Sequence, residues 1–258
     1  MAVQPVSAQT MIVTDTQGLD AGEVRIPVRD GTMAAYRAMP ASGTRFPVVL
    51  VISEIFGVHQ YIQDTCRRLA KRGYCAVAPA LYAKYGDVST LPDAQTIIRE
   101  VVSKASDEEI ASYLDSTLAW AGQESKADLA RAGITGFCWG GRVTWMYAAH
   151  NPSLKAGVAW YGRLTQGFHP GSKNPIDIAA SLTVPVLGLY GGADTGIPLS
   201  DVEKMQAELA KGSSGSQIHV YPDAPHAFHA DYRPTYRKEA AEDGWARMLD
   251  WFKRHGVA

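Results

Sequence analysis

The chain has 258 residues, of which 46% are hydrophobic and 20% charged, and its formal net charge is −1. This balance is ordinary for a soluble globular protein with a sizeable core, and it gives no reason to expect nucleic acid or an anionic membrane as a partner. The longest aliphatic run, residues 48–52, is far too short to span a bilayer. Membrane insertion is not expected either.

The three cysteines form no Cys-x-x-Cys pair and make no disulfide framework. Cys66 falls in a helical pattern and Cys75 in an apolar strand, which predicts that both are buried thiols. The histidines and cysteines show no zinc-ligand spacing. The sequence therefore indicates neither a metal nor a cofactor.

The N-terminus allows two interpretations. We expect residues 1–20 to be a flexible segment that precedes a single domain over residues 21–258. Residues 1–10 lack the basic region and the long apolar stretch of a complete secretory leader, which favours a cytoplasmic protein. The sequence Val-Ser-Ala-Gln at residues 6–9 also fits the remnant of a leader cleavage region, so a periplasmic location is the alternative.

The first half of the chain predicts a β-hairpin and then a strand–helix–strand unit. Asp30-Gly31 is the turn signal of the hairpin. The aliphatic run that follows it is typical of a parallel strand buried on both faces. The predicted elements are strands at residues 23–28, 33–38, 48–52 and 74–77 and a helix at about residues 61–71.

The second half predicts further alternation of strands and helices. A region rich in turn formers at residues 79–93 is followed by helical patterns, one of which begins at the start signal of residues 106–109, Ser-Asp-Glu-Glu. Alternation of this kind is typical of an α/β fold, with a mostly parallel central sheet and helices on both faces. The remaining predicted elements are strands at residues 132–136, 157–161, 184–190 and 217–221 and helices at about residues 142–149, 199–211 and 241–252.

The stretch around Cys138 has the spacing of a nucleophile elbow, with cysteine where serine is commoner. Gly136 and Gly140 each lie two residues from Cys138, between a predicted strand and a predicted helix. Such a turn holds its central residue above the sheet, and the missing Cβ atoms of the glycines let neighbouring backbone come close. The elbow predicts that Cys138 is a nucleophile; an ordinary tight turn is the alternative.

A nucleophilic thiol needs a base, and the base needs a group that orients it. In α/β hydrolases the chain order is nucleophile, acid, histidine. Asp194 lies just past the predicted strand at residues 184–190, where ligand groups of α/β sheets gather. His226 lies in the loop after the last predicted strand. Cys138, Asp194 and His226 therefore form a candidate triad; a turn aspartate and a surface histidine are the alternatives.

These residues resemble the dienelactone hydrolase family (carboxymethylenebutenolidases), over nearly the whole chain from about Gly22. The resemblance implies an α/β-hydrolase fold with Cys138 as nucleophile, Asp194 as acid and His226 as base. It rests on five motifs in the family's order, at residues 54–58, 80–82, 136–141, 191–198 and 225–228.

The resemblance also implies roles for the loop after the buried strand at residues 48–52. Glu54 matches a family carboxylate that interacts with the resting thiol and helps to deprotonate it when substrate binds. Burying a carboxylate at the edge of a central strand is costly, which fits a site residue; a solvated loop glutamate is the alternative. The backbone N–H of Trp139 is the first candidate donor to a tetrahedral oxyanion, and the family match implies the N–H of Ile55 as the second.

The expected reaction is hydrolysis of a small lactone or carboxylic ester. A thiolate attacks the carbonyl, the alcohol or enol leaves, and water activated by His226 hydrolyses the thioester, without a cofactor. The family arginine that binds the substrate carboxylate has no counterpart here, because Ala230 stands in its place. A chloroaromatic-pathway dienelactone is therefore in doubt as the natural substrate. The candidate substrate-binding residues are Tyr82, Lys84, Arg99, Trp160, Phe228 and Arg233.

Two other functions are compatible with the fold. A non-catalytic ligand-binding protein would have a broken triad, whereas this triad is intact by sequence. A redox role for Cys138 is disfavoured because no resolving cysteine lies near it in the sequence. We expect a monomer or a small homo-oligomer.

Overall fold

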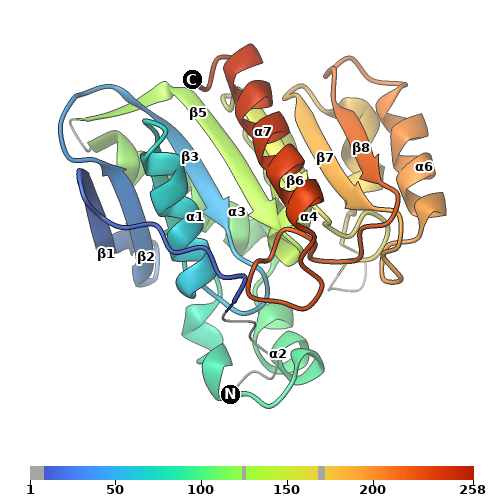
Figure 1. The fold of residues 1–258 in the computed structure, drawn as a ribbon, viewed down its shortest axis with the longest axis horizontal. Helices are drawn as coiled ribbons and strands as arrows, with labels where there is room; N and C mark the ends of the chain where they lie inside the picture. The colour runs from blue at the N-terminus through green and yellow to red at the C-terminus, as the bar shows by residue number, and fades with distance from the viewer. Residues whose placement is uncertain (1–8, 124–125, 168–171) are drawn as a thin grey trace.

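The computed structural model describes residues 9–123, 126–167 and 172–258, which form an eight-stranded sheet flanked by helices (Figure 1). The strand order across the sheet is β1-β2-β4-β3-β5-β6-β7-β8. The strands are β1 (Leu19–Val28), β2 (Gly31–Pro40), β3 (Phe46–Ile52), β4 (Cys75–Pro79), β5 (Ala127–Phe137), β6 (Ala156–Trp160), β7 (Val186–Gly191) and β8 (Gln217–Tyr221). The helices are α1 (Gln60–Ala70), α2 (Ala94–Glu100), α3 (Asp107–Gln123), α4 (Trp139–His150), α5 (Pro175–Ile178), α6 (Leu199–Leu209) and α7 (Lys238–Arg254).

Neighbouring strands run parallel from β4 to β8, and β1 and β2 form an antiparallel hairpin at one edge. Val28 pairs with Gly31, so the hairpin turns where Asp30-Gly31 predicts it, although both strands are longer than predicted. The α/β class and the mostly parallel sheet are confirmed. Strand β5 begins five residues before the predicted strand (132 − 127 = 5), because its first residues pair with the start of β3.

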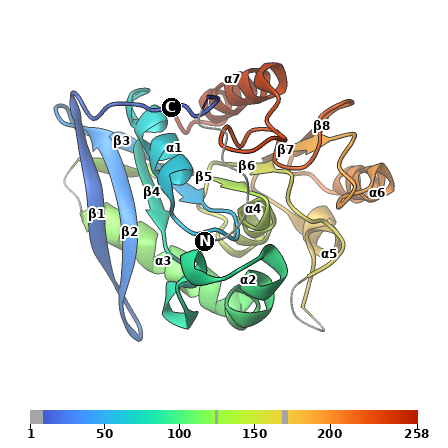
Figure 2. The same ribbon diagram turned by 60° about the horizontal axis from the view of Figure 1, so that its bottom comes forward.

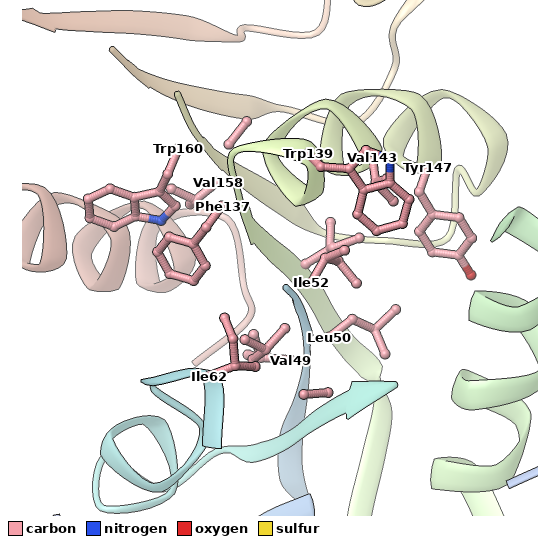
Figure 3. Close-up of a cluster of buried hydrophobic side chains, with 14 of the residues drawn as sticks. Val49, Leu50, Ile52, Ile62, Phe137, Trp139, Val143, Tyr147, Val158 and Trp160 are labelled. Atoms are coloured by element: carbon pink, nitrogen blue, oxygen red, sulfur yellow. The ribbon is translucent and has the colours of Figure 1, made fainter. Parts of the chain in front are cut away.

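Helices cover both faces of the sheet, with α1 and α7 on one side and α3 and α4 on the other (Figures 1 and 2). Every residue of β3 after Phe46 is buried, which explains its unbroken aliphatic run. Figure 3 shows Phe137 and Trp160 packed on one side of the sheet and Trp139 and Val143 on the other. The core is therefore continuous through the strands that carry the predicted site.

Two predictions about smaller features are confirmed. Cys66 and Cys75 are free, fully buried thiols. The Ser106 hydroxyl accepts a hydrogen bond from the Glu109 N–H at 3.2 Å, as expected at a helix start. Among the described residues, no helix has the length and apolar character needed to cross a membrane.

The N-terminal segment differs from the expectation of a flexible stretch over residues 1–20. Residues 1–8, which include most of the possible leader remnant, lie outside the described residues. Further on, the Ile12 N–H donates to Asp231 at 3.2 Å and the Thr14 N–H donates to Asp64 at 2.6 Å. Strand β1 already begins at Leu19. These hydrogen bonds hold the segment against the domain, so residues 10–20 belong with it.

The strand order reverses between β3 and β5. From β3 the chain passes through α1 to β4 on one side, whereas β5 pairs with the other side of β3. In open parallel sheets, ligands bind at the carboxyl ends of the strands beside such a reversal. The loop from residue 53 follows β3 and Cys138 follows β5, so both predicted site segments lie at this point.

Candidate active site

Cys138 lies in the tight turn between β5 and α4 and has a strained backbone, with φ 55° and ψ −113°. The flanking glycines make this turn possible. A Cβ on Gly136 would lie 2.2 Å from the Gly140 carbonyl oxygen, and a Cβ on Gly140 would lie 2.4 Å from the carbonyl oxygen of Ile52. The Cys138 N–H donates to the Trp160 carbonyl at 3.0 Å. The elbow is therefore packed, backbone against backbone, on β3 and β6.

His226 and Asp194 meet beside the elbow. The Nδ1 atom of His226 lies 2.7 Å from Oδ2 of Asp194, and the other oxygen of this carboxylate accepts hydrogen bonds from the N–H groups of Gly196 (2.8 Å) and Ile197 (3.2 Å). Asp194 is buried, with 5% of its surface exposed. Because the carboxylate can only accept, it selects the tautomer that carries a proton on Nδ1 and leaves Nε2 for another partner.

That partner is Cys138, which is hydrogen-bonded to the His226 side chain. Burial alone would lower the pKa of His226, but the negative charge of Cys138 and the hydrogen bond to Asp194 outweigh it and raise the pKa to about 10. The imidazole of His226 is therefore held in its protonated form at neutral pH.

A cavity of about 270 Å³ opens at Cys138 and is lined in part by Trp139, Ile55, Asp194 and His226. Trp139 is the first residue of α4, so its N–H has no acceptor within the helix. The N–H of Ile55 makes no backbone hydrogen bond within the described part of the chain. The structure thus brings both predicted oxyanion donors and the three candidate triad residues to one cavity.

Glu54 is fully buried, but its carboxylate has partners other than the thiol. Tyr232 donates to Oε2 at 2.5 Å, and His59 and Arg233 each lie 3.7 Å from a carboxylate oxygen. Burial opposes ionisation, yet His59 and Arg233 bring the pKa of Glu54 below its usual value. Tyr232 engages only Oε2, and Oε1 has no hydrogen-bond partner among the described residues, so the contact of Glu54 with the resting thiol stays a prediction.

A sequence model of the dienelactone hydrolase family matches residues 33–256. This protein belongs to that family. It is 60% identical over 261 residues to a Methylorubrum extorquens protein with the provisional name carboxymethylenebutenolidase, covering 100% of this chain and 89% of the relative. An Escherichia coli K12 protein with the same provisional name is 50% identical over 251 residues, covering 96% of this chain and 92% of the relative.

Solved structures agree with the family match. A crystal structure from Klebsiella pneumoniae, described provisionally as a dienelactone hydrolase, superposes with a TM-score of 0.89 at 50% identity and covers 92% of this chain and 99% of the other. The α/β-hydrolase fold is therefore shown, and the chain is a hydrolase of the dienelactone hydrolase type.

In this dienelactone hydrolase family member, the predicted cationic substrate-binding residues lie apart from the cavity. Lys84 forms ion pairs with Asp30, at 2.7 Å, and with Glu109 in a separate depression beside the β1–β2 hairpin. Arg99 lies on α2 with 68% of its side chain exposed and pairs with Glu100. Arg233 faces Glu54. Glu100 adjoins Arg99 in the sequence, but spacing could not reveal the partners of Lys84 and Arg233, which come from distant parts of the chain.

The predicted aromatic residues support the site from behind. Trp160 and Phe228 are fully buried, and neither lines the cavity. Phe228 packs edge-on against Tyr161, whose own ring packs edge-on against His226 at 5.2 Å between centroids. Tyr82 is also buried, and its hydroxyl bonds to the loop that carries Ile55. These side chains pack behind the residues that line the cavity and are not themselves part of its lining.

The cavity also has lining residues that sequence reasoning missed. Tyr161, Ile98 of α2 and Arg142 of α4 all line it. Arg142 makes a two-pronged ion pair with Asp107, at 2.6 and 2.8 Å, and is 2% exposed. Its place four residues after Cys138, one helical turn along α4, is the signal that could have found it. Arg163 lines the cavity as well, and unlike these residues it was expected from the sequence as one of the cations that could face the thiol.

Proposed function

We propose that this protein hydrolyses small lactones or carboxylic esters through a Cys138–His226–Asp194 triad and a thioester intermediate. The observation that carries the proposal is the hydrogen-bonded chain from Asp194 through His226 to Cys138, which opens into a cavity beside two backbone N–H groups. The strained φ of Cys138 supports it, because strain of this kind persists at functional sites.

In the proposed reaction, the Cys138 thiolate adds to the carbonyl carbon and forms the S–C bond. The carbonyl electron pair moves to oxygen, and the N–H groups of Trp139 and Ile55 stabilise this oxyanion. Protonated His226 then gives its Nε2 proton to the leaving oxygen as the C–O bond breaks, which leaves a thioester.

Neutral His226 next takes a proton from water, which adds to the thioester. A second tetrahedral intermediate collapses, the S–C bond breaks, and the carboxylic acid leaves with the thiolate restored. Asp194 stays ionised throughout and holds the imidazole by its Nδ1–H. No step uses a cofactor.

The proposal is tested by hydrolysis of p-nitrophenyl acetate. We expect Cys138→Ala and His226→Ala each to lower kcat/KM by at least about a thousandfold, the scale of losing a triad member. Cys66→Ala is the matched control, because Cys66 is buried away from the cavity, and it should keep the native rate. Unchanged turnover in Cys138→Ala would refute the proposal.

A non-catalytic ligand-binding protein is the second candidate. Iodoacetamide separates the two functions, because Cys66 and Cys75 are fully buried and labelling of the native protein therefore reports Cys138. A reactive catalytic thiol should be alkylated rapidly, with activity lost in step with labelling. A Cys138 that resists alkylation in a protein without esterase activity would favour the binding function.

A further inference from the structure

Tyr82 follows β4 and ends the motif Ala80-Leu81-Tyr82, and its place in the structure differs from the substrate contact that the sequence suggests. The side chain is 3% exposed and does not line the cavity at Cys138. We propose that Tyr82 is a positioning residue that holds the two backbone N–H donors of the oxyanion hole, those of Ile55 and Trp139, in a fixed position relative to each other. This inference rests on the function proposed above and adds to it a residue that never touches substrate.

The first half of the hole is carried by the turn at residues 54–57, which has Ile55 at its second position. In an ordinary β-turn the first carbonyl accepts a hydrogen bond from the fourth N–H. Here the Tyr82 hydroxyl takes both places: it donates to the Glu54 carbonyl at 2.7 Å and accepts from the Gly57 N–H at 2.7 Å. Gly57 has φ 78°, which fits the end of such a turn. One hydroxyl therefore closes the turn around the Ile55 N–H.

The second half of the hole is the N–H of Trp139, at the start of α4. The ring of Tyr82 packs edge-on against the ring of Trp139, with 5.2 Å between centroids and 78° between the planes. Such edge-to-face contacts are favourable and directional. Tyr82 thus touches the turn after β3 by its hydroxyl and the residue after the nucleophile by its ring, and it fixes the distance between the two donors.

The hydroxyl is suited to a fixed role because it stays neutral. Burial raises the pKa of Tyr82 further above its usual value, so the O–H remains a donor to the Glu54 carbonyl across the working pH range. A phenylalanine at this position keeps the ring but removes the hydroxyl that bridges the Glu54 carbonyl and the Gly57 N–H. The turn would then relax, and the Ile55 N–H would lose its aim at the oxyanion.

The test compares Tyr82→Phe with the native protein, with every rate divided by the number of Cys138 thiols titrated by iodoacetamide. Loss of alignment at an oxyanion donor should lower kcat for p-nitrophenyl acetate about 10- to 100-fold and leave KM within about threefold. Tyr147→Phe is the matched control: Tyr147 is also buried and donates to Asp115 at 2.8 Å, on the far part of α4, and it should keep the native kcat.

The affinity for a trifluoromethyl ketone is a measurement that a purely structural role of Tyr82 would leave unchanged. The thiolate adds to the ketone carbonyl to form an S–C bond and an oxyanion, with no leaving group, so the affinity for 1,1,1-trifluoro-4-phenylbutan-2-one reports the hole directly. We expect Tyr82→Phe to weaken this inhibitor by the same factor that kcat falls. Native inhibitor affinity, native kcat, or a change confined to KM would each overturn the inference.

Two further arms keep the outcome clear. If Tyr82→Phe yields no folded protein, 4-aminophenylalanine at position 82 keeps the ring and a donor but is a poorer acceptor for the Gly57 N–H. This variant should bind the inhibitor more weakly than the native protein at an unchanged KM, and native inhibitor affinity would overturn the inference. An active Cys138→Ala variant would instead refute the proposed function, whatever Tyr82→Phe does.

Discussion

Replacing Asp194 by asparagine should reverse the proton arrangement of the site while keeping its shape. In the native protein Oδ1 accepts from the N–H groups of Gly196 and Ile197, and Oδ2 accepts from His226. An asparagine oxygen will stay with the two N–H groups, so its NH₂ group must face Nδ1 of His226. The imidazole then accepts at Nδ1 and carries its proton on Nε2, toward Cys138. In that tautomer it cannot take a proton from the thiol.

The expected loss is large because the hydrogen bond is buried and charged. We expect kcat for p-nitrophenyl acetate to fall about 10³- to 10⁴-fold, with KM changed by less than about threefold. The Asp194 hydrogen bond also helps to raise the pKa of His226 to about 10, so the variant should hold less imidazolium at neutral pH. Asp223→Asn, at an exposed position in the same loop as His226, is the control. A kcat within tenfold of native in Asp194→Asn would refute this reasoning.

Two further predictions concern substrate charge and stability. Arg163→Ala should raise KM for mono-p-nitrophenyl succinate about tenfold and leave KM for p-nitrophenyl butyrate unchanged, because Arg163 lines the cavity; equal changes for both esters would exclude a role in charge recognition. Burial raises the pKa of Asp231 to about 6, so its contribution to stability is fully present below about pH 4 and is lost as pH rises through 6. Asp231→Asn should therefore gain stability relative to native between pH 4 and 7 in urea unfolding, and a constant difference across that range would contradict this.

Where the signal is local, the sequence predicts which of the candidate site residues lie close together. The elbow is a spacing of glycines around Cys138, and Asp194 and His226 follow strands whose carboxyl ends must share one edge of the sheet. The periodic strands and helices were predictable for the same reason, although β5 starts earlier because pairing with β3, rather than its own pattern, sets its beginning.

The sequence could not predict contacts between loops that lie far apart in the chain. The charge of Lys84 suggests a substrate contact. Lys84 instead forms ion pairs with Asp30, in the turn of the hairpin, and with Glu109, on α3. Glu54 was identified as a site residue, yet its partner Tyr232 lies 178 positions away, and no spacing rule links them. The sequence shows which residue types are present, whereas the packing of loops decides which of them meet.

The elbow has a consequence for how the family can change over evolutionary time. Residue 138 lines an open cavity, so another side chain of similar size can replace the cysteine there without moving the backbone. Gly136 and Gly140 have no such freedom, since a single added carbon would collide with a carbonyl oxygen at 2.2 or 2.4 Å. Position 138 can therefore be substituted without disturbing the turn, whereas positions 136 and 140 require glycine. New chemistry would arise by exchanging the nucleophile and the loops within an unchanged frame.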